Sequence, residues 1–194
     1  EVMKKTMQRE QPQRSVLLSP FRLDRREVTT EEFVGWLNKQ PNVSLDKDRF
    51  VKLDGAIVAD IYPMYQPFAG FSYDKREKKF VVPREFRRRP ATQLSWHAAQ
   101  RYCIGQGKRL PTEAEWEFAA RGVEGRRFPW GFDEPNCERS VSSRAAELSC
   151  AKHGAGPRDV ASTRGDVTPE GVYDLGGNVA AWVADVFYEQ YQEC

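Results

Sequence analysis

Apolar residues recur at helical spacing in three stretches of the chain. In the first stretch the apolar positions lie three and four residues apart, at Phe33, Trp36 and Leu37. Thr29 and Glu32 have the spacing of a capping box, in which each side chain bonds the backbone N–H of the other residue. Because a proline disfavours helical geometry in the residue before it, Pro41 ends the pattern. The sequence therefore predicts a helix over about residues 30–39.

A second helix is predicted after Ser95, which is its natural N-cap. Its apolar stripe consists of Trp96, Ala99 and Cys103, and it ends near Gly105 and Gly107.

The third helix has the clearest start and stop signals. Thr112 is its N-cap, Glu115 completes a second capping box, and Gly122 provides the stop. The apolar face is formed by Trp116, Ala119 and Ala120, and Leu110 before the cap is placed to pack against the indole.

Between the first two helices the pattern changes to short β-like runs. These runs cover about residues 50–53, 57–61, 71–73 and 80–82, and a further strand is expected over residues 15–23. The charged residues 74–79 predict a turn, and hence a surface hairpin. Beyond Gly122 the glycines and prolines predict mostly irregular loops. Together these elements predict an α+β fold.

Composition limits the domain organisation and the classes of partner. Residues 1–14 are polar and form a loose lead-in, while residues 15–194 are long enough for one domain with a hydrophobic core. The formal net charge is +2, from 30 Lys and Arg against 28 Asp and Glu. This balance argues against a nucleic-acid partner. The apolar runs are too short to span a membrane.

Several motifs resemble one known family. Residues 107–122, Gly-Lys-Arg-Leu-Pro-Thr-Glu-Ala-Glu-Trp-Glu-Phe-Ala-Ala-Arg-Gly, are similar to the signature of the formylglycine-generating enzymes, also called sulfatase-modifying factors. Further matches follow the order of the family, at Leu23-Asp24 with Glu27-Val28-Thr29, Leu94-Ser95-Trp96 with Ala99 and Tyr102-Cys103, Phe128-Pro129-Trp130-Gly131, and Gly171-Val172-Tyr173-Asp174-Leu175 with Gly177-Asn178-Val179 and Trp182. The resemblance implies a variant of the C-type-lectin-like fold, with two main helices, small antiparallel sheets and much ordered loop.

The resemblance also implies a chemistry for which this chain lacks the expected residues. Enzymes of the family oxidise a sulfatase cysteine to formylglycine with molecular oxygen, using two neighbouring cysteines that bind copper(I) in bacterial members. Paired thiolates suit this soft ion. The four cysteines here lie far apart in the sequence, at Cys103, Cys137, Cys150 and Cys194. The closing motifs of the family are also missing, so we expect the domain to be incomplete at its C-terminus.

Two functional hypotheses follow from this difference. We favour a non-catalytic, lectin-like module that binds a protein or glycan partner. The alternative is a copper-dependent formylglycine-generating oxidase whose active-site segment lies outside these residues.

Calcium is the other cofactor that the resemblance suggests. The stretch from Gly171 to Trp182 is called the second motif below. Its matching calcium ligands are the side chain of Asp174 and the carbonyls of Gly177 and Val179, with Ala181 where the family has a glutamate. Because charge count sets the affinity of calcium sites, we expect an empty or weakly occupied loop. Backbone hydrogen bonds would then hold Gly176, Gly177 and Asn178. A second family site corresponds to Asn136 and the carbonyl of Cys137.

The cysteines also bear on the cellular compartment. Cys137 and Cys150 bracket an irregular loop, and a disulfide between them would stabilise it by about 3 kcal/mol. This pairing predicts a periplasmic or secreted protein. The alternatives are two buried free thiols in a cytosolic protein, or a partial zinc site with His153. By the resemblance, Cys103 is expected to be unpaired or paired outside these residues, with Cys194 as the second choice of partner.

Two other clusters have simple structural interpretations. Residues 84–89 hold four arginines, which fit a solvated loop better than an anion-binding patch. Ser95 and His97 do not form a catalytic pair, because Ser95 is a helix cap and His97 lies on the outer face of its helix.

Overall fold

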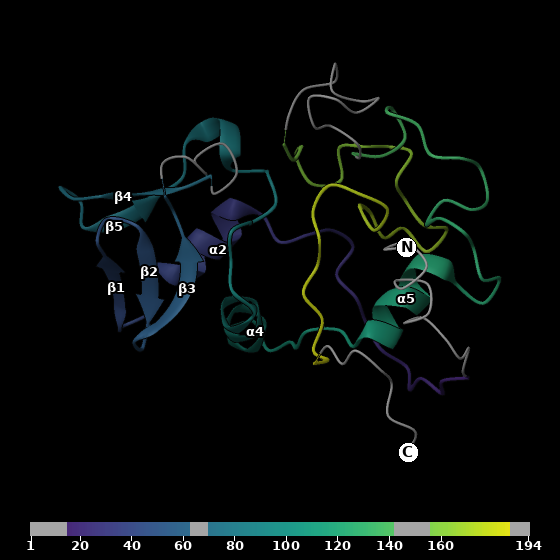
Figure 1. The fold of residues 1–194 in the computed structure, drawn as a ribbon, viewed down its shortest axis with the longest axis horizontal. Coiled ribbons are helices and arrows are strands. Elements are labelled where there is room, and N and C mark those ends of the chain that lie inside the picture. The colour runs from purple at the N-terminus through teal and green to yellow at the C-terminus, as the bar shows by residue number, and fades with distance from the viewer. Residues whose placement is uncertain (1–14, 63–69, 142–155, 187–194) are drawn as a thin grey trace, which may run out of the picture.

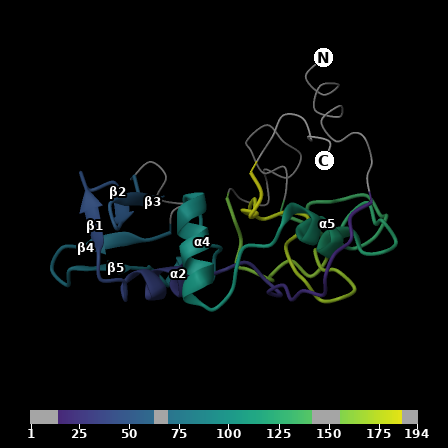
Figure 2. The ribbon, with the colours of Figure 1, turned by 90° about the horizontal axis from the view of Figure 1, so that it is seen from below.

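The computed structural model of the protein describes residues 15–62, 70–141 and 156–186. These residues form two lobes that lie side by side in both ribbon views (Figures 1 and 2). One lobe contains the β-strands and two of the α-helices, and the other contains one α-helix surrounded by long irregular loops. The described part of the chain is therefore an α+β fold, as the sequence predicts.

Two small antiparallel sheets form one side of the first lobe. Strands β1 (Val43–Asp46), β2 (Phe50–Leu53) and β3 (Ala56–Asp60) pair in that order. Strand β4 (Ser72–Asp74) pairs with β5 (Lys79–Val81), which confirms the predicted hairpin. The predicted runs correspond to β2 through β5. Strand β1 was not predicted, because its two apolar residues are too few to set a pattern.

Helix α2 (Thr30–Leu37) covers these sheets and begins at the predicted capping box. The Thr29 hydroxyl accepts a hydrogen bond from the backbone N–H of Glu32, and the Glu32 carboxylate accepts one from the backbone N–H of Thr29 at 2.9 Å. The apolar face of α2 then packs into the core of the first lobe. This core comprises Phe33, Val34, Trp36, Leu37, Val51, Leu53, Val58, Ala59, Ile61, Phe71, Phe80 and Ala98.

Helix α4 (Trp96–Gly105) starts at Ser95 as predicted, but its buried face differs from the predicted one. The Ser95 hydroxyl accepts a hydrogen bond from the backbone N–H of Ala98. Ala98 is the buried residue of this helix, because its side of the helix packs on β3. The predicted stripe is only partly buried, and two of its members, Ala99 and Cys103, line the groove between the lobes.

Helix α5 (Glu113–Arg121) belongs to the second lobe and has the predicted ends. Thr112 and Glu115 form the capping box, and Gly122 ends the helix with a positive φ of 62°. Arg109 donates to both carboxylate oxygens of Glu115, at 2.7 and 2.6 Å, and this contact lowers the pKa of Glu115 to about 2. The start of α5 is thus held by a charged pair as well as by its cap.

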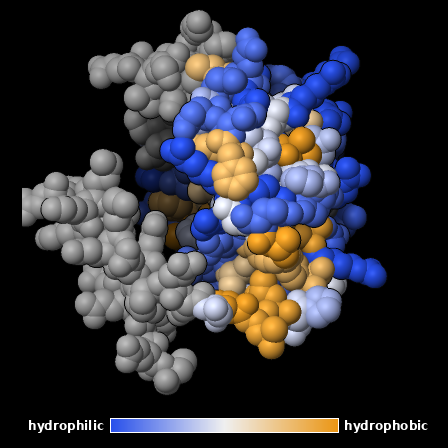
Figure 3. Space-filling model, turned by 90° about the vertical axis from the view of Figure 1, so that its right-hand side faces the viewer, coloured by the Kyte–Doolittle hydropathy of each residue, from blue (hydrophilic) through white to orange (hydrophobic). Residues whose placement is uncertain are grey.

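One expectation about regular structure is wrong. Residues 15–23 form no strand in the described part of the chain, and the ring of Phe21 instead packs edge-on against Phe118 at 6.3 Å. Figure 3 shows an apolar area on one face of the molecule. Val16, Leu17 and Phe118 are among the exposed apolar side chains of the described residues. The described residues contain the three α-helices that the helical patterns predict, α2, α4 and α5, and α2 has the predicted capping box and apolar face.

The arginine-rich residues 84–89 begin with a short 3₁₀ helix, η2 (Arg84–Phe86), none of whose residues is buried. This exposure agrees with the solvated loop expected from the sequence. Within the described residues, no helix has the length and apolar character needed to cross a membrane.

Replacing Thr112 by alanine is expected to destabilise the protein by about 1 kcal/mol. The substitution removes the hydroxyl that accepts the Glu115 backbone N–H at 3.2 Å. Urea unfolding would measure the loss, with the exposed Ser162→Ala as a control that removes a hydroxyl without a cap. Equal unfolding midpoints for the two variants would contradict the role of the cap.

Replacing Arg126 by alanine is expected to cost about 2–4 kcal/mol, because its guanidinium is a buried charge with several partners. The side chain is only 5% exposed and donates to Glu170 at 3.0 Å and to the carbonyl of Ala120, at the C-terminal end of α5. A cation at this end also interacts favourably with the helix dipole. Arg127→Ala is the matched control, because the neighbouring side chain is 62% exposed. A similar small loss of unfolding free energy for both variants would refute this account.

Candidate functional site

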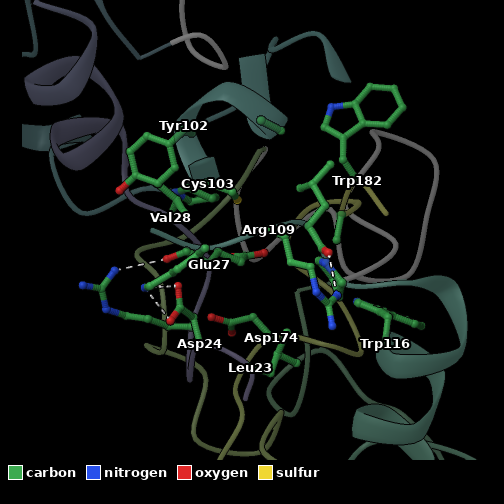
Figure 4. A pocket seen from close by; sticks show the side chains of 18 of the residues that line it. Leu23, Asp24, Glu27, Val28, Tyr102, Cys103, Arg109, Trp116, Asp174 and Trp182 are labelled. Carbon is green, nitrogen blue, oxygen red and sulfur yellow. Dashed lines mark hydrogen bonds and ion pairs between the residues drawn. The ribbon is translucent and has the colours of Figure 1, made fainter. Parts of the chain in front are cut away.

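A groove of about 990 Å³ lies between the two lobes. Figure 4 shows side chains from both lobes that line it, among them Leu23, Val28, Trp116 and Trp182. The fold brings these residues together from three parts of the chain, namely the segment before α2, the region of α4 and α5, and the second motif. Trp116 also has a buried indole N–H without a hydrogen-bond partner in the described structure. The groove thus offers a largely apolar surface to a ligand, whereas the indole N–H of Trp116 is enclosed by the protein.

Residues 182–185 close one side of this groove and connect the lobes. On the first lobe, the Trp96 indole donates to the Val183 carbonyl at 2.7 Å, and the Trp182 indole donates to the Leu94 carbonyl at 3.1 Å. On the second lobe, the Asp185 carboxylate accepts the backbone N–H of Glu113 at 2.7 Å, at the start of α5. The motif tryptophan Trp182 therefore helps to hold the two walls of the groove in place.

Cys103 is a free cysteine that faces the groove from α4 (Figure 4). This agrees with the first choice made from the sequence, an unpaired Cys103. Burial raises the pKa of the thiol, and the charge of Asp24 acts in the same direction. Lys108 opposes these effects, but it is paired with Asp24 at 2.8 Å. The thiol is therefore kept protonated and is a poor nucleophile at neutral pH.

The second motif places Asp174 in the interior of the second lobe. Its side chain is 5% exposed and accepts the backbone N–H of Ala161 at 2.6 Å. Val179 lies nearer the surface and donates its backbone N–H to Glu27 at 3.3 Å, while Ala181 is exposed and lines the groove. Hydrogen bonds to protein groups thus help to order the aspartate and the loop that follows it.

The predicted backbone hydrogen bonds of this loop are present for two of its three residues. The Gly176 N–H donates to the Asp166 carboxylate at 2.9 Å, and the Asn178 N–H donates to the Val141 carbonyl at 3.0 Å. Gly177 packs so closely on Val141 that a Cβ would lie 2.8 Å from its carbonyl oxygen. The glycine is therefore required by the close approach of two backbones.

Glu27 joins this loop to the segment before α2. Its carboxylate accepts hydrogen bonds from the Asn178 side chain at 2.7 Å and from the backbone of Val179. Burial, followed by the charge of Asp174, raises the pKa of Glu27 to about 8. Glu27 is therefore a carboxyl that stays protonated at neutral pH.

Asp166 is the third carboxyl of this region, after the buried Asp174 and the half-buried Glu27. It is 1% exposed, and one of its oxygens, Oδ2, has no hydrogen-bond partner in the described structure. Burial raises the pKa of Asp166 to about 6, and the charge of Asp174 adds to the increase. Glu27, Asp166 and Asp174 thus form a set of electrostatically coupled acids. No set of three or more His, Cys, Asp or Glu side chains in the described ranges is arranged to hold a metal ion.

The other predicted site residues lie apart from the groove lining. Asn136 is exposed, and its side-chain oxygen accepts the backbone N–H groups of Glu138 and Arg139, at 3.1 and 2.8 Å. Cys137 is disulfide-bonded, but Cys150 lies outside the described residues, so the pairing of these two cysteines stays a prediction. The partial zinc site also stays untested, because His153 lies in the same undescribed segment.

Two residues of the acidic set were missed as functional candidates. Glu27 stands in a quoted family motif, directly before the partly buried Val28, and a carboxylate next to this apolar residue could have marked it. Asp166 follows Gly165 in a turn-rich segment without periodicity, so no sequence signal distinguishes it from a surface turn residue.

The comparisons with known proteins agree with the motifs. A family model described as "Sulfatase-modifying factor enzyme 1-like domain" matches residues 1–194. The chain is 41% identical over 108 residues to a Bos taurus protein named "Inactive C-alpha-formylglycine-generating enzyme 2". This match covers 53% of this chain and 34% of that protein. It is 30% identical to the "Formylglycine-generating enzyme" of Bos taurus, over 91% of this chain and 51% of that protein. The "Formylglycine-generating enzyme" of Streptomyces coelicolor is also 30% identical, over 94% of this chain and 63% of that protein.

The chain thus spans between about a third and two thirds of the lengths of these relatives. The family model nevertheless covers the whole chain. The protein therefore belongs to the sulfatase-modifying factor family, the family of the formylglycine-generating enzymes.

Proposed function

We propose that this chain is a non-catalytic member of its family that binds an extended protein segment in the groove between its lobes. The groove has the size of a ligand pocket and a largely apolar lining, which suits the side chains of a peptide. Within the broader α+β class, we assign the domain to the lectin-like variant of the fold, and a glycan is the second choice of partner.

The cysteines support a non-catalytic role. The family reaction uses two neighbouring thiols, whereas in the described residues Cys103 is free and Cys137 is in a disulfide. The raised pKa of Cys103 also disfavours the thiolate that a metal-binding cysteine must supply. A relative of this chain bears the name of an inactive enzyme, which agrees with this interpretation.

Peptide display on the immobilised 194-residue chain tests the proposal. Selected peptides are then titrated by fluorescence anisotropy against two matched variants. Leu23→Glu places a charge in the groove and is expected to weaken binding about tenfold or more, whereas Leu17→Glu changes a fully exposed leucine outside the groove and should have little effect. Failure to select any binding peptide, or equal affinity in both variants, would overturn the proposal.

The alternative of a copper-dependent oxidase is tested with the same protein. The relatives named formylglycine-generating enzymes favour it, provided that a second thiol comes from sequence outside this chain. A cysteine-containing sulfatase peptide is incubated with copper(I), oxygen and the chain, and its products are analysed by mass spectrometry. We expect the cysteine to remain unchanged. Conversion to formylglycine would show that the chain is an enzyme.

Calcium binding at the second motif is expected to be weak, and Ala181→Glu is expected to tighten it about tenfold or more by restoring a carboxylate. The buried carboxylate of Asp174, together with that of Asp166, with which it interacts electrostatically, would provide the negative charge that attracts calcium. Isothermal titration with calcium compares the wild type, Ala181→Glu and the matched exposed change Ala184→Glu. Tight binding by the wild type that Asp174→Ala abolishes would show that the loop functions without the family glutamate.

The proposed compartment is the periplasm or the extracellular space, because Cys137 takes part in a disulfide. Non-reducing peptide mapping would identify its partner, which we expect to be Cys150. Free thiols at both positions in protein purified without reductant would argue for the cytosol.

A further inference from the structure

A second hollow, of about 500 Å³, lies in the first lobe between β1 and the β4–β5 hairpin. Its apolar lining consists of Leu37, Val43, Leu45, Tyr73 and Phe80. Lys75, Lys78 and Lys79 also line it, against one acidic residue, Asp48. The hollow therefore combines an apolar floor with a positively charged rim, on the far side of the strands from the inter-lobe groove.

The outer edge of β1 borders this hollow. Three consecutive residues of β1, numbers 43–45, line it, as expected where a strand presents its backbone edge rather than one face. The Asp54 N–H bonds the Asn42 carbonyl, so residues 42 and 54 form a hydrogen-bonded pair of the β1–β2 ladder. Since such pairs alternate in an antiparallel ladder, the peptide groups of Val43 and Leu45 point away from β2. Neither has a hydrogen-bond partner within the described ranges.

Two neighbouring strand edges are closed, in contrast to that of β1. The outer edge of β3 is covered by residues 93–95, because the Ser95 N–H bonds the Val58 carbonyl at 3.0 Å and the Asp60 N–H bonds the Gln93 carbonyl at 3.1 Å. The outer edge of β5 is closed by the Asn38 amide, which bonds both the N–H and the carbonyl of Phe80 at 2.9 Å. The edge beside the hollow is thus available to pair with another chain.

The lysines indicate the charge of the chain that would fit there. Lys78 has no ion-pair partner in the part of the chain that the structure describes. Lys75 is paired with Asp48, but the two side chains are 72% and 68% exposed, so the pair is easily exchanged for another carboxylate. A peptide that places acidic side chains over this rim would find complementary charge beside an open strand edge.

We propose that β1 binds an extended acidic segment of a partner protein by strand addition. The segment pairs with the outward peptide groups of Val43 and Leu45 and places its carboxylates against Lys75 and Lys78. Backbone hydrogen bonds provide a general affinity for extended chains, and the lysines select acidic ones. This site is separate from the inter-lobe groove and does not depend on the function proposed for it.

Fluorescence anisotropy with a short labelled peptide of alternating valine and glutamate tests the proposal on the full 194-residue chain. The same peptide with every backbone nitrogen methylated cannot donate to the β1 edge in either orientation, and a valine–lysine peptide has the wrong charge. We expect saturable binding of the first peptide only. No saturable binding, or equal binding of the N-methylated or the lysine peptide, would overturn the proposal.

Two lysine variants distinguish an effect of the rim lysines on peptide binding from an effect of the protein's net charge. Lys78 and Lys47 are both exposed and both have a positive φ, of 50° and 52°, so exchange for glutamate has a similar backbone cost at each site. Lys78→Glu is expected to weaken binding about tenfold, whereas Lys47→Glu, outside the hollow, should change it by less than about threefold. Equal losses would reject the site. Dimers seen by sedimentation that the peptide dissociates would instead identify a second copy of this chain as the occupant and overturn the proposal.

Discussion

Raising the pH from about 5 to about 9 is expected to destabilise the folded protein through Glu27. Burial and the charge of Asp174 raise the pKa of Glu27 from 4.5 to about 8 in the folded state. In the unfolded chain the carboxyl ionises near its ordinary pKa. Between these two values the folded protein therefore holds a proton that the unfolded chain has released. Stability falls as the pH rises through this interval, by at most about 5 kcal/mol in total.

The neighbouring acids affect other parts of the pH range. The pKa of Asp166 is raised to about 6 and that of Asp174 is also raised, so both add to the loss of stability at the lower end of the interval. Glu32 and Glu115 act in the opposite direction, because their pKa values are lowered to about 2 by Arg26 and Arg109. Their contribution is present above their ordinary pKa and is lost only in acid. The alkaline loss therefore belongs to the buried set around Glu27.

Urea unfolding at a series of pH values, with a chelator present, measures this loss. In Glu27→Gln the titrating group is absent, so the unfolding free energy should change much less between about pH 6 and about pH 9. The glutamine NH₂ group replaces one of the two oxygens that accept from Asn178 and Val179, so a lower stability of the variant at acid pH is expected as well. Glu138→Gln, an exposed change, should follow the wild type. Parallel pH profiles for wild type and Glu27→Gln would disprove the assignment.

The elements that depend on neighbouring residues could be predicted from the sequence. The capping boxes of α2 and α5 are complete within four residues each, so Thr29 and Thr112 could be identified without knowledge of the fold. The hairpin of β4 and β5 is similarly local. The buried face of α4 could not be predicted, because both sides of this helix carry apolar residues and only the position of β3 decides between them.

The candidate site depends on contacts between distant parts of the sequence. Glu27 and Asn178 are 151 residues apart, and they meet because the chain returns to the segment before α2 after building the second lobe. The motif residues Asp174 and Trp182 could be named from the family resemblance. Their partners, Ala161 and Leu94, follow no pattern that periodicity or spacing can detect. The same is true of Arg126, whose burial among carbonyls contradicts the usual exposure of arginine.

Replacing Phe33 by alanine is expected to destabilise the protein by about 3–5 kcal/mol. The ring is 1% exposed in the core of the first lobe. It contacts three other aromatic rings, those of Trp36, Phe71 and Tyr102, at centroid distances of 5.5, 6.3 and 6.0 Å. Its removal leaves a cavity where α2, α4 and the segment before β4 meet. Because cores are close-packed, these neighbours can only partly fill the space.

Chemical denaturation of Phe33→Ala measures the loss, and Phe132→Ala is the matched control. Phe132 is 65% exposed, so removal of the same ring there should cost less than about 1 kcal/mol. Tyr102 lines the inter-lobe groove as well as touching Phe33, so the core variant should also weaken a peptide bound in that groove. Phe33→Leu keeps most of the volume and is expected to lose about half as much stability as Phe33→Ala. If alanine cost no more at position 33 than at position 132, the aromatic cluster could not be the core that holds the first lobe together.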